Sequence, residues 1–196
     1  MANPTLAVPN YLADPGVLYY APIGTALPAN TVAGGVFTDS WATNGPWVTL
    51  GMTETGSDLT LQLTASPIMA AERLEPLAYR STNRTTTVGF ALKGYTAGNL
   101  QKTLNGAVTT VTGAAATTLT QIDPPQLGSE TRCMLGWESQ DNTVRWVAFQ
   151  VLNSGSIKMG FVKVPATTTL PWTGNGEISP TYGQATRMWT AGLGRA

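Results

Sequence analysis

The sequence predicts a mainly β protein with one short α-helix, and three observations support this. Threonine recurs in short runs along the chain, and its branched β-carbon favours extended strands. The 21 glycines and 13 prolines provide the turns that join many strands. Several segments alternate apolar and polar residues with a period of two, which is typical of a strand that packs one face on a core.

Three strands are predicted in the first half of the chain. A short apolar strand is expected over residues 17–21, and a second strand over residues 59–64. The leucines of the second strand share one face, which we expect to be core, while the other face meets water. A third strand over residues 87–93 alternates in the same way.

Only residues 96–106 show the pattern of a helix. Thr96 is a suitable N-cap, and Leu100 and Leu104 are four residues apart. Asn105 and Gly106 form a typical C-terminal stop. We expect the leucines to pack on a sheet, so that the helix covers the core.

An antiparallel meander is predicted in the second half. Residues 131–138 alternate, residues 139–142 are turn formers, and residues 143–152 are apolar on both faces, as in a central strand. After a break at residues 153–155, a third strand is expected over residues 157–164.

We expect one domain over residues 1–196, because this length suits one core and no shift in composition marks a boundary. Two long loops rich in Gly, Pro and Thr are predicted, at about residues 22–56 and 165–180. Loops of this length usually bind something or cross to a neighbour.

The residue inventory excludes several kinds of chemistry. The chain has no histidine and one cysteine, Cys133, so histidine-activated nucleophiles, His-containing zinc sites and intrachain disulfides are ruled out. The carboxylates lie beside turn formers or, like Glu72 and Glu75, in an ordinary charged patch. We therefore expect no catalytic, cofactor-binding or metal-binding residues, and a protein that is not an enzyme.

Charged side chains make up only 11% of the residues and cancel to a net charge of zero, against about 25% in an ordinary soluble protein. A surface with few like charges repels its own copies weakly, so dense self-assembly is permitted. A small exported β-domain coated with Thr and Ser would explain the composition equally well. Without a basic cluster we expect no specific nucleic-acid binding, and without a signal peptide or membrane span we expect synthesis in the cytoplasm.

Six tryptophans are many for this length. Trp137 and Trp146 fall in predicted strands, where core burial explains them. The others either pin loops onto their own domain or anchor an interface. The candidate inter-subunit anchors are Trp41, Trp47, Leu50, Trp172 and Trp189. A different possibility is a β-sandwich that binds carbohydrate on the loop tryptophans.

Five strings follow one another in the first half of the chain. Four of them are GVLYYAPIGTALP at residues 16–28, FTDSW at 37–41, WVTLGMTETG at 47–56 and SPIMAAE at 66–72. The fifth lies in the predicted helix, which has Asn-Leu at residues 99–100 and Leu-Asn-Gly at residues 104–106. Their order resembles the major tail proteins, or tail tube proteins, of long-tailed bacteriophages of actinobacteria. Beyond them only the strand order is similar.

The resemblance implies an antiparallel β-sandwich or barrel of the tail-tube type with one short flanking α-helix. Such subunits form hexameric rings that stack into a hollow tube, and their inner sheets join around the lumen without exposed edges. The head-to-tail contact between stacked rings does not close on itself, so the tube could grow without limit. Other proteins must therefore set the length of the tube. The implied partners are copies of the chain, a tape-measure protein, a tail terminator and distal tail proteins. DNA would cross the lumen without specific binding, no membrane would be involved, and the protein would reside in the virion tail.

In the resembling family, the strand after the first long loop forms a wall of the channel. Here that strand is residues 54–64, and its polar face would line the lumen and let DNA slide past. The candidate lumen-facing residues are Glu54, Asp58, Thr60, Gln62 and Thr64. The alternative is that this face simply meets solvent.

Overall fold

A computed structural model describes residues 15–43, 45–71, 74–94, 96–112, 118–157 and 169–191. The strands of its first half are β1 (Gly16–Pro22), β2 (Val32–Ala33), β3 (Val36–Phe37), β4 (Val48–Thr49), β5 (Thr53–Ile68) and β6 (Ala78–Leu92). Those of its second half are β7 (Ala107–Thr112), β8 (Thr118–Asp123), β9 (Cys133–Ser139), β10 (Val144–Asn153), β11 (Leu170–Gly176) and β12 (Thr186–Thr190). One α-helix, α1 (Ala97–Thr103), and a 3-10 turn (Trp41–Thr43) complete the elements of these residues. The protein is mainly antiparallel β with a single short helix in its described part, as the sequence predicts.

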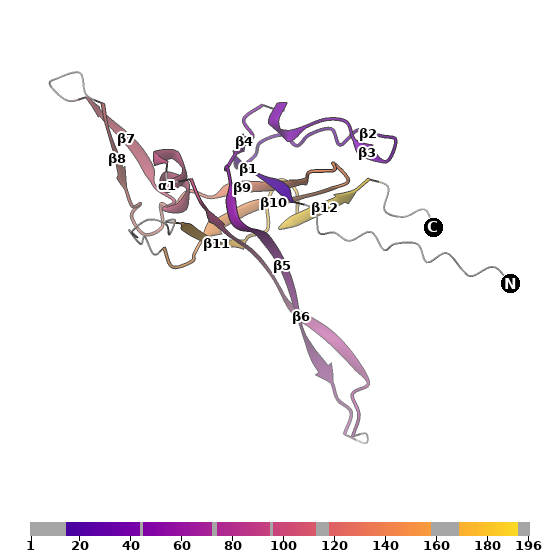
Figure 1. The fold of residues 1–196 in the computed structure, drawn as a ribbon. Helices are drawn as coiled ribbons and strands as arrows, with labels where there is room; N and C mark the ends of the chain where they lie inside the picture. Colours follow the sequence, from indigo (N-terminus) through magenta and orange to yellow (C-terminus); the bar gives the residue numbers. More distant parts are fainter. Residues whose placement is uncertain are drawn as a thin grey trace.

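Eight of the described strands form one antiparallel sheet, in the order β4-β1-β9-β10-β11-β6-β5, with β12 also beside β10. β11 and β12 pair with different halves of β10, at residues 151–153 and 144–148. Figure 1 shows that the β5–β6 hairpin extends away from this sheet, and that a separate β7–β8 pair extends in another direction beside α1.

β9 and β10 form the centre of the sheet and are buried on both faces. Leu135 and Trp146 point into one hydrophobic cluster, together with residues of β6 and β11. Met134 and Val147 point into a second cluster on the opposite face, which Trp41 from the long loop covers. This confirms the predicted hairpin and the prediction that its second strand is apolar on both faces.

Helix α1 lies inside the segment that the sequence predicts. The side chain of Thr96 accepts a hydrogen bond from the backbone N–H of Asn99 at 3.2 Å, which confirms the N-cap. The expected apolar face is only partly present. Leu100 packs against the core, but the buried helix residues are Asn99 and Thr103. Asn99 donates to the carbonyl oxygen of Leu50, so hydrogen bonds as well as apolar contacts hold the helix on the sheet.

The two predicted loops differ from the structure. The first contains β2, β3, β4 and the 3-10 turn, and it ends where β5 begins at Thr53. The second is wrong over Leu170–Gly176, because this segment forms β11 between β6 and β10. The glycines and the proline of this segment indicated turns. Backbone pairing with the neighbouring strands β6 and β10 makes the segment a strand instead. Residues 165–168, and the predicted third strand from residue 158 onward, lie outside the described residues.

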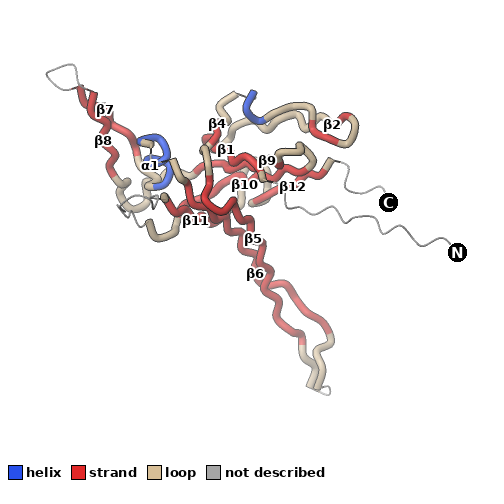
Figure 2. The backbone as a smooth tube through the Cα atoms, in the orientation of Figure 1, coloured by secondary structure: helices blue, strands red, loops and turns tan. Residues whose placement is uncertain are grey.

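The β5–β6 hairpin is attached to the sheet only at its base. β11 pairs with β6 between residues 87 and 92, whereas the pairing of β5 with β6 continues outward to Ile68 and Ala78. From Thr60 outward every residue of β5 is exposed, as is β6 from Ala78 to Thr85. Figure 2 shows this outer half as a two-stranded ribbon that projects from the body.

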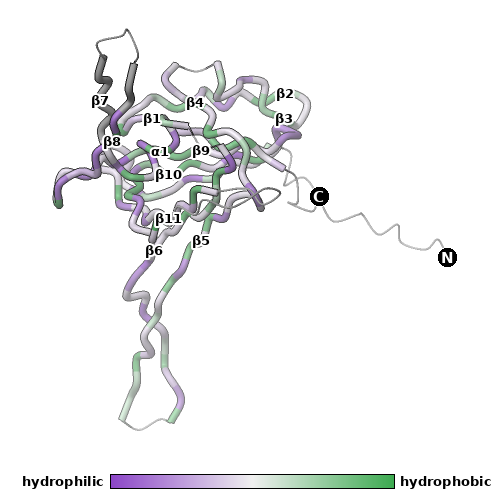
Figure 3. The backbone as a smooth tube through the Cα atoms, turned by 60° about the vertical axis from the view of Figure 1, so that its left-hand side comes forward, coloured by the Kyte–Doolittle hydropathy of each residue, from purple (hydrophilic) through white to green (hydrophobic). Residues whose placement is uncertain are grey.

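The prediction that the leucine face of β5 is core is therefore wrong beyond the hairpin base. Leu59 packs against the core, but Leu61 and Leu63 are each 56% exposed. The reason is tertiary, because β12 flanks that face only across a hollow and leaves more than half of each leucine exposed. Figure 3 shows hydrophobic and hydrophilic residues interspersed along the projecting strands.

Candidate interaction site on the β5–β6 hairpin and at its base

The outer β5–β6 hairpin, residues 60–68 and 78–86, is amphipathic. Leu61 and Leu63 lie on one face of β5, opposite Thr86 and Arg84 of β6. Alternation in a strand places every second side chain on the same face, so the leucines continue the apolar row that begins at Leu59. Beyond Leu59 the described chain covers this row only in part, since Leu61 and Leu63 are each 56% exposed.

The other face carries four of the five lumen candidates. All four are exposed, and they are Asp58, Thr60, Gln62 and Thr64. The β6 residues opposite them are Gly89, Thr87, Thr85 and Asn83. Between Asp58 and Thr64 this face therefore holds a single charge among small polar groups.

Glu54 is also exposed, but it lies outside this alternation. The register between β5 and β6 shifts between Thr53 and Ser57, and Gly56 has a φ of 94°, which glycine adopts without strain. Exposure of the five residues fits both a channel wall and a surface that meets solvent, so the lumen assignment stays a prediction.

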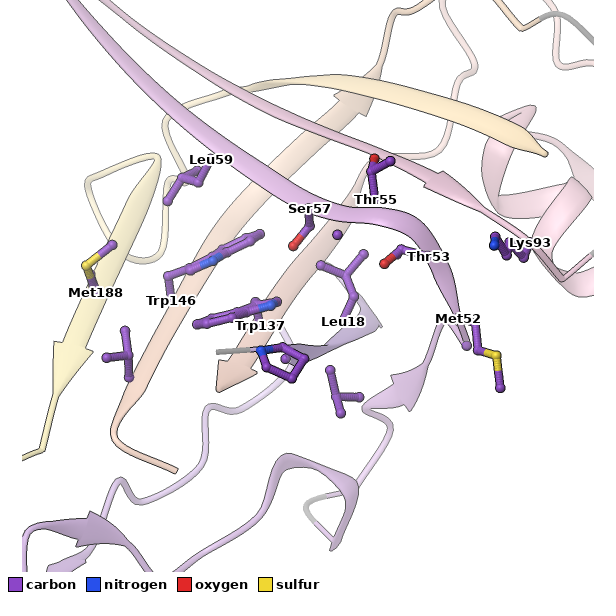
Figure 4. A pocket seen from close by; sticks show the side chains of 16 residues that line it. Leu18, Met52, Thr53, Thr55, Ser57, Leu59, Lys93, Trp137, Trp146 and Met188 are labelled. Atoms are coloured by element: carbon purple, nitrogen blue, oxygen red, sulfur yellow. The ribbon is translucent and has the colours of Figure 1, made fainter. Parts of the chain in front are cut away.

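A groove lies at the base of the hairpin. This tryptophan groove, of about 940 Å³, is bounded by β1, β5, β9, β10 and β12. Figure 4 shows the indole rings of Trp137 and Trp146 side by side in it, with Leu18 and Ser57 on one side and Met188 on the other. Trp137 and Trp146 are directly paired across β9 and β10.

A second hollow, the hairpin groove of about 450 Å³, lies between the hairpin and β12. Leu61, Leu63 and Arg187 line it, and Leu59 and Met188 line both grooves. The apolar face of the hairpin therefore continues directly into the tryptophan groove. Together they form one apolar surface along the hairpin.

Four of the five candidate anchors are buried within the subunit. Trp41 is 0% exposed, Leu50 3%, and Trp47 and Trp172 each 4%. Their surfaces are already covered by their own chain, so they are not free to anchor a neighbouring subunit. Trp41 and Trp47 instead pin the long loop, and Leu50 and Trp172 belong to the core of the subunit. Trp189 is half-buried against the second cluster and keeps part of its surface free of its own chain.

The pinning contacts are specific. The rings of Trp41 and Trp47 meet edge to face at 4.4 Å, and Trp47 Nε1 donates to the carbonyl oxygen of Ala26 at 2.9 Å. Trp41 fits against β9 only because residue 136 is glycine, since a Cβ there would lie 1.7 Å from the Trp41 ring. The long loop is therefore a fixed part of the body.

An ion-pair network also holds the long loop. Arg145 of β10 is fully buried and donates from Nε to Glu138 Oε1 at 2.8 Å. It also donates from Nη1 to Asp39 Oδ1 of the loop at 3.1 Å, and its guanidinium lies 4.3 Å from the Phe37 ring. A buried charge is stable only when it is paired, so Arg145 ties the loop to the centre of the sheet.

The environment of Asp39 shifts its pKa. Partial burial by itself would raise the pKa, but the hydrogen bond from the backbone N–H of Asn30 and the charge of Arg145 outweigh it. The pKa of Asp39 is therefore held below its ordinary value of 3.8. The carboxylate therefore stays charged to a lower pH than that of an ordinary aspartate.

Sequence reasoning assigned Asp39 to a turn and did not identify Arg145 or Glu138. A signal was present, because Arg145 is the only charged residue in the apolar run 143–152. A single charge in a strand that is buried on both faces indicates a buried ion pair. The identity of its partners is not readable, since Asp39 lies 106 positions away.

Among the described residues, no group of three or more Cys, Asp or Glu side chains is placed to hold a metal ion. In the same part of the chain, no helix is long and apolar enough to cross a membrane.

No protein-family model and no curated protein matches the chain. Among solved structures, the chain is similar to one in the "Cryo-EM structure of the anti-feeding prophage (AFP) baseplate, 6-fold symmetrised". The two share 10% sequence identity with a TM-score of 0.42, over 98% of this chain and 100% of the other. A TM-score of this size does not establish a shared fold.

Proposed function

We propose that the chain is a structural subunit of a bacteriophage virion of the major tail protein class. In this proposal it assembles into hexameric rings that stack into the tail tube through which DNA passes during ejection. The observation that carries the proposal is the outer β5–β6 hairpin, whose apolar face is uncovered in a single subunit. An isolated two-stranded hairpin is only marginally stable in water, so a partner surface is expected.

The edges of the sheet support self-assembly. Among the described residues β5 pairs only with β6, which leaves its outer edge free along Thr53–Ile68. The short strand β4 ends the sheet at the other side. Free edges recruit further strands, and a contact between two different edges of identical subunits generates a ring or a filament.

The polar face of β5 suits the wall of a channel for DNA. It offers hydroxyl and amide groups and a single carboxylate between Asp58 and Thr64. Phosphates bind tightly where Lys and Arg are clustered, so this face would let DNA slide. The tape-measure protein, the terminator and the distal tail proteins follow as partners of such a tube, and no catalytic role is proposed.

The carbohydrate-binding alternative loses its main support. It requires loop tryptophans that present a flat ring to a sugar, whereas Trp41, Trp47 and Trp172 are buried. Trp172 stacks on Phe90 with ring centres 4.8 Å apart, so that part of its surface is already used inside the subunit.

Assembly is tested with the purified chain by size-exclusion chromatography and negative-stain electron microscopy. We expect the unmodified chain to form rings or tubes with sixfold symmetry. Leu61→Ser with Leu63→Ser should stay monomeric, because it removes the apolar face of the hairpin. The matched control is Thr60→Ser with Thr64→Ser on the opposite face, which should assemble.

Circular dichroism and urea unfolding check that both double variants keep the fold. A chain that remains monomeric at high concentration would contradict the proposal. Equal assembly of the leucine variant and the unmodified chain would contradict the assigned interface.

The lumen assignment has its own test. Gln62→Lys places a positive charge on the polar face, so tubes should still form while DNA ejection from particles becomes slower. Failure of the variant to form rings would place this face in a subunit contact instead, and unchanged ejection would place it outside the channel.

A further inference from the structure

The tryptophan groove exposes apolar side chains that no described element covers. Val17 is 40% exposed, Met188 53% and Met52 78%, and all three line the groove. Trp137 is half-buried at its floor. A continuous apolar hollow of this kind marks a binding surface.

The described chain begins at the wall of this groove. Pro15 and Gly16 are both lining residues. A Cβ at Gly16 would lie 2.2 Å from the indole of Trp137, so the backbone runs in direct contact with that ring. Residues 1–14 therefore join the described chain at the wall of the groove.

The sequence of residues 1–14 suits an apolar groove. No charged side chain occurs from Ala2 to Ala13, and Pro4 and Pro9 disfavour a helix and favour an extended backbone. The larger apolar residues of the segment are Leu6, Val8, Tyr11 and Leu12.

The charged side chains of the groove and of the segment differ in sign. Lys93 is the only charged side chain among the described residues that line the groove. Asp14, the one acidic residue of the segment, directly precedes Pro15 on the groove wall. The groove and the segment therefore carry side-chain charges of opposite sign.

We propose that residues 1–14 occupy the tryptophan groove of their own subunit, with apolar side chains against Trp137, Trp146 and Met188. Fully extended, fourteen residues reach up to about 50 Å, so the segment can follow the groove toward the hairpin. Its attachment gives it an effective concentration of about millimolar, which favours it over the same segment of another copy. The proposal does not depend on ring assembly, because it concerns one subunit.

Cross-linking of the full-length chain tests the proposal. The test variant carries Val8→Cys and Met188→Cys, and the control carries Val8→Cys and Ile23→Cys. Ile23 is 51% exposed, close to the 53% of Met188, but it does not line the groove. The native Cys133 does not compete, because burial raises the pKa of its thiol to about 12.

We expect the groove pair to cross-link within a monomer at least about tenfold faster than the control pair, at a rate independent of protein concentration. Dimeric products with a concentration-dependent rate would overturn the proposal and assign the groove to a second copy. Equal rates for the two pairs, or no cross-link at all, would also overturn it. Failure of ring assembly leaves this result unchanged, which separates the two proposals.

A fluorescence measurement avoids engineered cysteines. Leu6→Ser with Val8→Ser should uncover the tryptophan groove, shift the emission to longer wavelength and increase quenching by acrylamide. Trp137→Phe should reduce this difference, because Trp137 forms the floor of the groove. Asn3→Ser with Asn10→Ser is the matched control and should change nothing. Identical emission of the serine variant and the unmodified chain would contradict the proposal.

Discussion

The β9–β10 hairpin and the outer β5–β6 hairpin share the same antiparallel ladder but have opposite surroundings. Nearly every side chain of β9 and β10 is buried, on both faces of the sheet. In the outer β5–β6 hairpin nearly every side chain is exposed, including Leu61 and Leu63. Backbone hydrogen bonds alone contribute little net stability. The comparison therefore shows that the first hairpin is stabilised by its own chain, whereas the second has little cover from the described part of its own chain.

The largest expected difference between the two hairpins concerns buried charge. Arg145→Met leaves Glu138 and Asp39 without their cation, and removing one partner of a buried pair costs about 3–5 kcal/mol. Arg84→Met on the outer hairpin, where the residue is exposed, should change stability by less than about 0.5 kcal/mol. Urea unfolding of both variants measures the two values. Equal destabilisation would show that Arg145 is not a central contact of the body.

Leucine truncation compares the same chemistry in both hairpins. Leu135 of β9 is 1% exposed, and Leu135→Ala should cost about 2–5 kcal/mol because it leaves a cavity. Leu63→Ala should cost less than about 0.5 kcal/mol in the monomer while weakening assembly. Thermal unfolding of monomeric protein measures the first effect and size-exclusion chromatography the second. A large loss of monomer stability from Leu63→Ala would mean that the outer hairpin is covered by its own chain.

A smaller effect is expected from acid. The folded pKa of Asp39 lies below its ordinary value of 3.8, so its contribution to stability is present above about pH 4 and is lost as the pH falls through the folded value. Asp39→Asn should therefore flatten the loss of stability below pH 4. Part of the dependence of stability on pH should remain in this variant, because the hydrogen bond from Arg132 also lowers the pKa of Glu177. Urea midpoints across this range test the prediction, and an unchanged slope for Asp39→Asn would contradict it.

The smallest perturbation is a thiol probe of the two hairpins. Cys133 at the start of β9 is buried, and burial raises the pKa of its thiol to about 12. At mildly alkaline pH it should react with a thiol reagent only after unfolding. In Thr64→Cys, the added thiol on the exposed hairpin should react at once. Prompt reaction of two thiols per chain under native conditions would show that the body opens far more readily than its burial indicates.

Local patterns predicted much of the fold. The Thr96 cap, the β9–β10 hairpin and the alternation of Val88, Phe90 and Leu92 depend on neighbours within a few positions, and the structure has all of them. β11 was missed because Pro171 and the glycines 174 and 176 indicate turns. Only the presence of β6 and β10 on either side makes that segment a strand.

The candidate site was predictable in part. Its polar and apolar faces follow from alternation alone, and the structure places Thr60, Gln62 and Thr64 together on one exposed face. The anchor assignments of Trp41, Trp47 and Leu50 failed because a pattern does not reveal whether a loop folds back over its own sheet. That of Trp172 failed because its segment is the core strand β11. The tryptophan groove was not foreseen, because it joins side chains of β1, β5, β9, β10 and β12, most of which are far apart in sequence.

The sequence by itself determined which residues share a face, where the helix begins, and that catalytic histidine and intrachain disulfides are excluded. Only the tertiary structure decided which faces are covered, how Arg145 joins the long loop to the sheet, and where the leucine row of β5 leaves the body. The physical reason is that alternation and capping are set by the geometry of adjacent residues. Burial depends instead on what the rest of the chain, or another chain, places across from them.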